Sequence, residues 1–175
     1  AAATGSTLAL ESGSAHVKAS ITETSIDGAR LGHNASWYRR LLGPAQASTV
    51  SGPDYPSLHF QQPQVAVYFP GHRSHKPAHI MTTWNRSFRT AAGIGPCSTL
   101  AAMRRVYGSR VAPAWAGTHG KQVFSWTLGE NILFVTGDQR TISAVVLFRG
   151  VAHEDHNSSP QTWANYVGLN ESACK

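Results

Sequence analysis

The stretch GIGPCSTLAAMRRVYG, residues 93–108, carries the clearest fold signal in this chain. Ser98 or Thr99 can cap a helix there, because either hydroxyl can accept a hydrogen bond from a backbone N–H group of the first turn. Gly108 ends the helix. The residues that supply its apolar face are Leu100, Met103, Val106 and Tyr107. The stretch therefore predicts one short, amphipathic helix.

An earlier stretch, GHNASWYRRLLG at residues 32–43, has the same form. Asn34 or Ser36 can cap this helix. Trp37 and Leu41 fall on its apolar face, and the glycine that closes the stretch is followed by a proline. The sequence thus predicts a second short helix with similar start and stop signals.

The closing glycines of the two stretches, Gly43 and Gly108, lie 65 residues apart. The same offset relates three further apolar pairs, which are Val67 and Ile132, Phe69 and Phe134, and Ile80 and Val145. A period that continues from a helix into strands predicts a repeat of whole structural units.

Short apolar and alternating segments around both helices predict strands. Before the first helix, residues 17–26 read as a strand with Val17, Ala19, Ile21 and Ile26 directed inward, whereas residues 45–56 carry turn chemistry. The other expected strands are 58–60, 64–69, 78–84, 111–115, 122–128, 132–135 and 141–148. The unbroken apolar run at 144–148 indicates that both faces of the last strand are at least partly covered.

Together these elements predict an α+β fold of two tandem units, each a short helical segment packed on an antiparallel β-meander sheet. The expected divisions are a flexible leader at 1–15, a first unit at 16–86, a second unit at 87–150, and a C-terminal linker with a short helix at 151–175. Units of about 65 residues would be marginal alone, so we expect them to share an interface.

The composition, with 41% hydrophobic and 14% charged residues, is that of a globular protein, and no apolar run approaches a membrane span. The net charge of +6 comes from scattered Arg and Lys, with no run of five or more, so we expect no nucleic-acid partner. An anionic envelope surface stays open as a partner.

The chain has two cysteines, Cys97 and Cys174. They can form one disulfide, which is the interpretation we favour, or they can be two separate buried thiols. Neither has a cysteine or histidine neighbour at metal-ligand spacing. The small, polar opening at residues 1–6 is either a native start or what remains after removal of a signal peptide, and we favour the second. These features predict an exported protein, secreted or in the cell envelope.

The elements of this sequence are, in order, a glycine pair, then a capped helix that ends in an Arg-rich turn and a glycine, then a meander of strands. This order of elements resembles the tandem units of the beta-lactamase inhibitor protein. The pattern is similar to the single unit of the small outer-membrane assembly lipoproteins, the SmpA/BamE kind, and to many secreted actinobacterial proteins. The segments that carry the resemblance are 93–108, 131–134 and 142–148, and more loosely 32, 37–43 and 65–69.

The cysteines depart from the inhibitor pattern. The inhibitor carries a disulfide inside each unit, whereas here the first unit has no cysteine. The resemblance therefore implies the fold and an inhibitor-like, BLIP-like scaffold, and it does not imply lactamase inhibition.

Histidines are the main candidates for chemistry. His72, His75 and His79 could gather a metal if their loop folds back, but Pro77 interrupts the spacing, and exposed loop histidines are the better interpretation. The cluster at 153–156 reads as surface linker, because the side chains of residues adjacent in sequence usually point in different directions.

Nucleophilic catalysis has little support in the sequence. There is no G-x-S-x-G motif, no pair of carboxylates at glycosidase-like spacing and no phosphate-cradling glycine loop. Cys97 with His119 or His59 is conceivable as a nucleophile and base, but a structural cysteine is the better interpretation.

Aromatic residues in or beside strands are the remaining candidates for a binding surface, because Trp, Tyr and Arg are common interface anchors. If one sheet face packs on helices and the other stays open, the predicted binding residues are Tyr55, Phe60, Trp84, Trp115, Phe124 and Trp126. Phe124 and Trp126 are expected on one face of their strand, with Val123, Ser125 and Thr127 on the other.

The sequence therefore predicts a non-catalytic protein-binding or inhibitor-like module without a cofactor or metal. One alternative is a hydrolase or metal-dependent enzyme that uses the 72–79 histidines, which metal content by mass spectrometry would reveal. The other is a basic cell-envelope structural protein, which salt would release from an anionic matrix.

Overall fold

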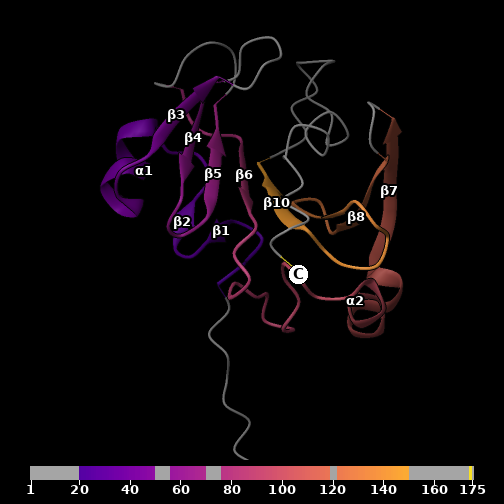
Figure 1. Cartoon of the computed structure of the whole chain (residues 1–175). Helices are drawn as coiled ribbons and strands as arrows, with labels where there is room; N and C mark the ends of the chain where they lie inside the picture. Colours follow the sequence, from indigo (N-terminus) through magenta and orange to yellow (C-terminus); the bar gives the residue numbers. More distant parts are fainter. Residues whose placement is uncertain (1–19, 50–55, 70–75, 119–121, 150–173, 175) are drawn as a thin grey trace, which may run out of the picture.

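Eight strands form one antiparallel sheet with the order β3-β4-β5-β6-β10-β9-β8-β7 (Figure 1). The computed structural model describes residues 20–49, 56–69, 76–118, 122–149 and 174, with backbone alone at 47–49, 115–118 and 122–123. The strands are β3 (Gln46–Thr49), β4 (Pro56–Phe60), β5 (Val65–Tyr68), β6 (Ile80–Thr83), β7 (Val111–Thr118), β8 (Gln122–Leu128), β9 (Ile132–Thr136) and β10 (Ala144–Phe148). The predicted α+β fold with an antiparallel sheet is confirmed.

The centre of the sheet is the pair formed by β6 and β10. Val145 pairs with Thr83 and Phe148 with Ile80, although the two strands are far apart in the sequence. β3 and β7 form the two edges. One continuous ladder therefore joins the strands that follow the first helix to those that follow the second.

Two eight-residue helices, α1 (Ala35–Leu42) and α2 (Leu100–Tyr107), lie at opposite ends of the sheet (Figure 1). Of the two cap candidates predicted for each helix, Asn34 and Thr99 act as the N-caps. The Asn34 side chain accepts from the Trp37 N–H group at 3.1 Å, and Thr99 accepts from Ala102 at 3.1 Å. No helix among the described residues has the length and apolar character needed to cross a bilayer.

Gly43 and Gly108 end the two helices, as predicted. Gly43 has φ 90° and ψ −157°, and its N–H group donates to the carbonyl of Arg39. Gly108 has φ 56° and ψ −128°, and it begins the short 3₁₀ helix η1 (Gly108–Arg110). Glycine suits these positions because residues with a Cβ atom rarely adopt such angles.

The strand residues bury side chains on both faces of the sheet. The cluster on the helix face includes Tyr38 of α1, Met103 of α2, and Val145 and Leu147 of β10. The cluster on the second face is formed by Ala66, Tyr68, Ile80, Leu133, Val135, Ala144, Val146 and Phe148, all of them buried. The predicted covering of both faces of residues 144–148 is confirmed, whereas the expectation of an open second face is wrong over the central strands.

Both helices expose one residue that the sequence placed on their apolar face. Leu41 and Val106 are each 48% exposed. The residues buried by α1 are Ala35 and Tyr38, and those buried by α2 are Leu100, Met103 and Tyr107. The predicted inward positions of Leu41 and Val106 are therefore wrong.

From Ser20, the first described residue, the chain forms a hairpin rather than the long strand predicted at 17–26, and Val17 and Ala19 lie outside the described residues. The strands of the hairpin are β1 (Ser25–Ile26) and β2 (Ala29–Arg30). Ile21 and Ile26 are buried, as predicted. The turns predicted at 45–56 are wrong at Gln46–Thr49, which form the strand β3.

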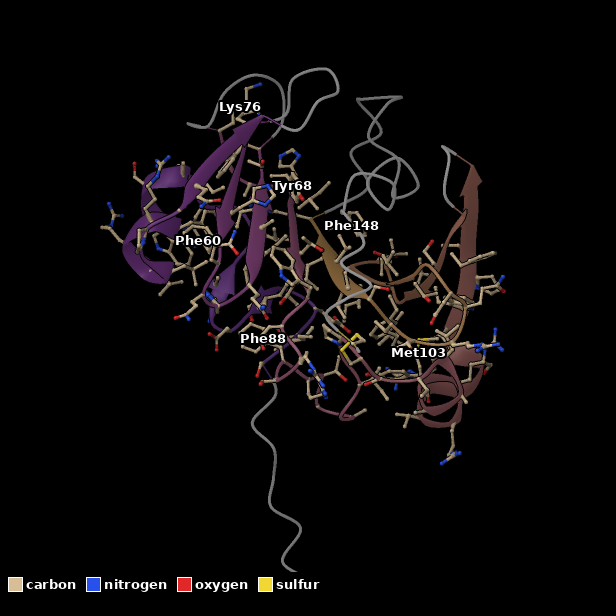
Figure 2. The ribbon with its side chains drawn as sticks, viewed as in Figure 1. Phe60, Tyr68, Lys76, Phe88, Met103 and Phe148 are labelled. Atoms are coloured by element: carbon tan, nitrogen blue, oxygen red, sulfur yellow. A yellow bond between two sulfur atoms is a disulfide. The ribbon has the colours of Figure 1, made fainter. Side chains whose placement is uncertain are left out.

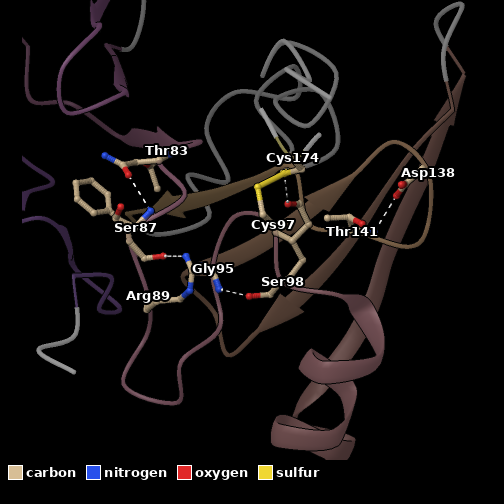
Figure 3. Close-up of a disulfide and its surroundings, with 12 residues drawn as sticks. Thr83, Ser87, Arg89, Gly95, Cys97, Ser98, Asp138, Thr141 and Cys174 are labelled. Atoms are coloured by element: carbon tan, nitrogen blue, oxygen red, sulfur yellow. Dashed lines mark hydrogen bonds between the residues drawn. A yellow bond between two sulfur atoms is a disulfide. The ribbon is translucent and has the colours of Figure 1, made fainter. Parts of the chain in front are cut away.

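Cys97 and Cys174 form a disulfide bond (Figure 3). The backbone N–H group of Cys97 donates to the carbonyl of Ile142 at 2.7 Å, just before β10. The bond thus links a residue beside the start of β10 to a residue 77 positions later in the chain. The predicted pairing of the two cysteines is confirmed.

Candidate binding cleft

Two of the six aromatic residues predicted to form a binding surface, Phe60 and Trp126, are core residues. Phe60 is fully buried and Trp126 is 6% exposed, and both belong to the cluster on the helix face. The guanidinium of Arg104 lies over the Trp126 ring, 5.6 Å from its centroid. Four strands separate β4, which carries Phe60, from β8, which carries Trp126. These two side chains stabilise the fold and share no surface.

The other four predicted residues are also spread over the molecule. Phe124 is half-buried and packs against the helix-face cluster, whereas Trp84 is half-buried and packs against the second-face cluster. Trp115 pairs with Ser125 through its backbone in β7, and its side chain lies outside the described part. Tyr55 lies outside the described residues. The described aromatic side chains are not brought together at one site.

A cleft of about 500 Å³ lies where the β1–β2 hairpin meets the end of β10. Figure 2 labels Phe148, the last residue of β10, at this end of the strand. The residues that line the cleft are Glu23, Thr24, Arg30, Leu31, Asn131, Phe148 and Arg149. Three segments that are distant in the sequence thus build one concave site, which is the usual form of a ligand site.

The hairpin is held in place by its turn and by its buried side chains. Asp27 and Gly28 join β1 to β2 with φ values of 50° and 80°, the positive values that a tight two-residue hairpin turn requires. Ile26 and Ala29 are fully buried in the helix-face cluster. The Asp-Gly pair between apolar residues is the sequence signal that could have located this hairpin.

Arg149 is positioned by its backbone and by close packing against Gly32. Its N–H group donates to the carbonyl of His79 at 2.9 Å. A Cβ atom at Gly32 would collide with Nη1 of the Arg149 guanidinium, and Gly32 also has φ +95°. Glycine therefore gives the guanidinium the space it occupies beside the hairpin.

Arg30 is tied to the same region through Tyr38. The Tyr38 hydroxyl donates to the carbonyl of Arg30, with 2.6 Å between the oxygens. Burial raises the pKa of Tyr38, and the positive charge of Arg149 acts in the opposite direction. Tyr38 therefore stays a neutral donor at physiological pH and fixes the backbone of Arg30.

The charge of the cleft is positive. Arg30 and Arg149 are exposed, and Glu23 is the acidic residue among those that line the site. Thr24 and Asn131 add a hydroxyl and an amide. The arrangement offers two guanidinium groups and two neutral polar groups to a ligand. The sequence did not single out either arginine, because both belong to its scattered basic residues.

Outside the cleft, one pair of residues resembles part of a hydrolase site. Ser57 Oγ lies 3.1 Å from His59 Nε2, within the reach of a nucleophile and its base. Both residues belong to β4 and are two positions apart, so strand geometry alone puts them on one face. Ser57 is 3% exposed, and its backbone is paired between β3 and β5. Pairing with β3 and β5 occupies the backbone N–H groups that an oxyanion site beside Ser57 would need. The contact between Ser57 and His59 is therefore a structural hydrogen bond.

The described residues offer little support for the cysteine nucleophile or for the histidine metal site. Cys97 is bonded to Cys174, so its sulfur is not a free thiolate nucleophile. Among the described residues, no group of three or more His, Cys, Asp or Glu side chains could hold a metal ion. Within the histidine cluster, His79 is half-buried beside β6. The histidine positions 72, 75 and 119 and the cluster at 153–156 lie outside the described residues.

No protein-family model, curated protein or solved structure matches the chain. The cleft and the scaffold that holds it are therefore the features that bear on function.

Proposed function

We propose that this protein is an exported, non-catalytic binding module that contacts a protein partner through the cleft between the β1–β2 hairpin and β10. The observation that carries the proposal is the placement of Arg30 and Arg149 in one concave site. Arginine is enriched at protein interfaces, where it combines charge, hydrogen bonding and apolar contact. Leu31 adds apolar surface to the same wall.

The scaffold of this module consists, in our proposal, of two tandem helix-plus-meander units that meet between residues 86 and 87. The equivalent bounds of α1 and α2, at 35–42 and 100–107, support this division, since they differ by 65 residues. Each helix is followed by four strands, and the last strands of the two sets, β6 and β10, pair at the centre. The cleft uses residues from both proposed units, so it would require their association.

An extracytoplasmic location fits the disulfide bond. Disulfides persist in oxidising compartments and are rare in the cytosol. The Cys97–Cys174 bond supports a secreted or envelope protein.

The test is capture of a partner from the secreted and envelope fractions of the producing cells. The Arg30→Ala/Arg149→Ala variant removes both guanidinium groups of the cleft. The matched control is Arg39→Ala/Arg105→Ala, which removes two exposed arginines from α1 and α2. We expect the cleft variant to retain less than about a tenth of the partner and the control to retain it fully. Equal capture by both variants would contradict the proposal.

A further inference from the structure

We infer that the cleft recognises a side-chain carboxylate in an acidic peptide segment of the partner, an inference that rests on the proposed function. The carboxylate would lie between the guanidinium groups of Arg30 and Arg149, and the adjacent peptide would follow the wall formed by Leu31.

The geometry of the two arginines suits a planar anion. A guanidinium presents its N–H donors in a fixed fork that matches the two oxygens of a carboxylate. Arg149 is held at its backbone by the carbonyl of His79 and packs its guanidinium against Gly32. The backbone of Arg30 is fixed by Tyr38. The Arg149 guanidinium therefore starts from a packed position, and the Arg30 side chain starts from a fixed backbone, which lowers the entropy cost of binding for Arg149 in particular.

The size of the cleft suits a short segment of chain. A volume of about 500 Å³ lies within the range of small-ligand sites. It can take one acidic side chain with its neighbours, but not a folded element. Thr24 and Asn131 can hydrogen-bond the peptide groups of such a segment.

The charge pattern favours a single carboxylate over a polyanion. Glu23 lies in the wall together with the two arginines. A polyphosphate carries a negative charge on every unit, and one of these would be forced close to Glu23, where like charges repel. A peptide can place one carboxylate on the arginines and present a backbone N–H group to Glu23.

The experiment is a titration of the intact, oxidised protein with acetyl-Ser-Glu-Leu-Ser-amide, followed by calorimetry or by amide shifts in NMR spectra. The control peptide replaces glutamate by glutamine, which keeps the shape and removes the charge. We expect the glutamate peptide to bind at least about tenfold more tightly, and Arg149→Ala to lose about tenfold in affinity. Arg149→Lys should also bind more weakly, because lysine keeps the charge but not the fork.

Three results would overturn the inference. They are equal binding of the two peptides, no loss in the Arg149→Ala variant, and tighter binding of sodium polyphosphate that displaces the peptide. The Arg39→Ala/Arg105→Ala variant should bind as the natural protein does. If the glutamate peptide fails while partner capture still depends on Arg30 and Arg149, the ligand class is wrong and the proposed function stands. If capture itself does not depend on them, the proposed function fails.

Discussion

His59 lies in β4 with its ring near Tyr68, at 6.1 Å between ring centroids, on the face turned away from the helices. Desolvation by burial lowers the pKa of His59 below its ordinary value of 6.5. The unfolded chain therefore binds more protons than the folded protein as the pH falls through this range, so acid favours unfolding. Burial raises the pKa of Tyr68 to about 12, so Tyr68 stays neutral throughout.

We expect the stability of the protein to fall between pH 7.5 and pH 5.5, partly because of His59. The loss of stability caused by His59 is absent above about pH 6.5. It grows as the pH falls toward the lowered pKa of His59 in the folded state. His59→Gln keeps a polar group beside Ser57 but does not titrate. Urea midpoints at both pH values should therefore differ less in the variant than in the natural protein. An equal loss in both proteins would show that His59 is not responsible.

At the scale of the helix, the four residues of α2 predicted to form one apolar face differ in burial, because Val106 is exposed. With about 100° per residue, Leu100, Met103 and Tyr107 fall within about 60° of one another, whereas Val106 lies about 60° beyond Met103. Leu41 occupies the corresponding position in α1. A helix of eight residues touches the sheet along a narrow stripe, so the residue at the margin of the apolar arc is exposed.

We expect Met103→Ala to lower the free energy of unfolding by about 2–4 kcal/mol, because it leaves a cavity in the helix-face cluster. Val106→Lys in the same helix should change it by less than about 0.5 kcal/mol, because that side chain is 48% exposed. Urea unfolding of the two variants beside the natural protein measures both effects. A large loss in Val106→Lys would place this residue in a contact that the structure does not show.

Capping residues, stop glycines and long alternating strands could be predicted because their signals are local. Thr99 and Gly108 act within one turn of the helix, and the predicted strand at 122–128 coincides with β8. The edge strand β3 could not be predicted, because Gln46–Thr49 has no apolar alternation and pairs on one side only. The cleft could not be predicted either, since it depends on distant segments meeting at Gly32 and Arg149.

At the scale of the whole molecule, the second face of the sheet is mainly apolar at its centre, where Thr82 is a buried polar residue, and more polar toward its edges. The central strands β5, β6, β10 and β9 carry the buried cluster of that face. The outer strands place Ser57 and His59 of β4, and Ser125 of β8, on the same side. The middle of the second face is therefore part of the core. A charged side chain introduced there would be surrounded by apolar neighbours.

Neighbouring residues of β10 test this two-faced core directly. Val145 belongs to the helix-face cluster and Val146 to the second-face cluster, and both are fully buried. Burying an unpaired carboxylate is costly, so we expect Val145→Asp and Val146→Asp each to lower the free energy of unfolding by more than about 3 kcal/mol. Thr127→Asp, on a half-buried position of β8, should cost much less. If the second face were open to water, Val146→Asp would behave like Thr127→Asp, and urea unfolding of the three variants separates these two outcomes.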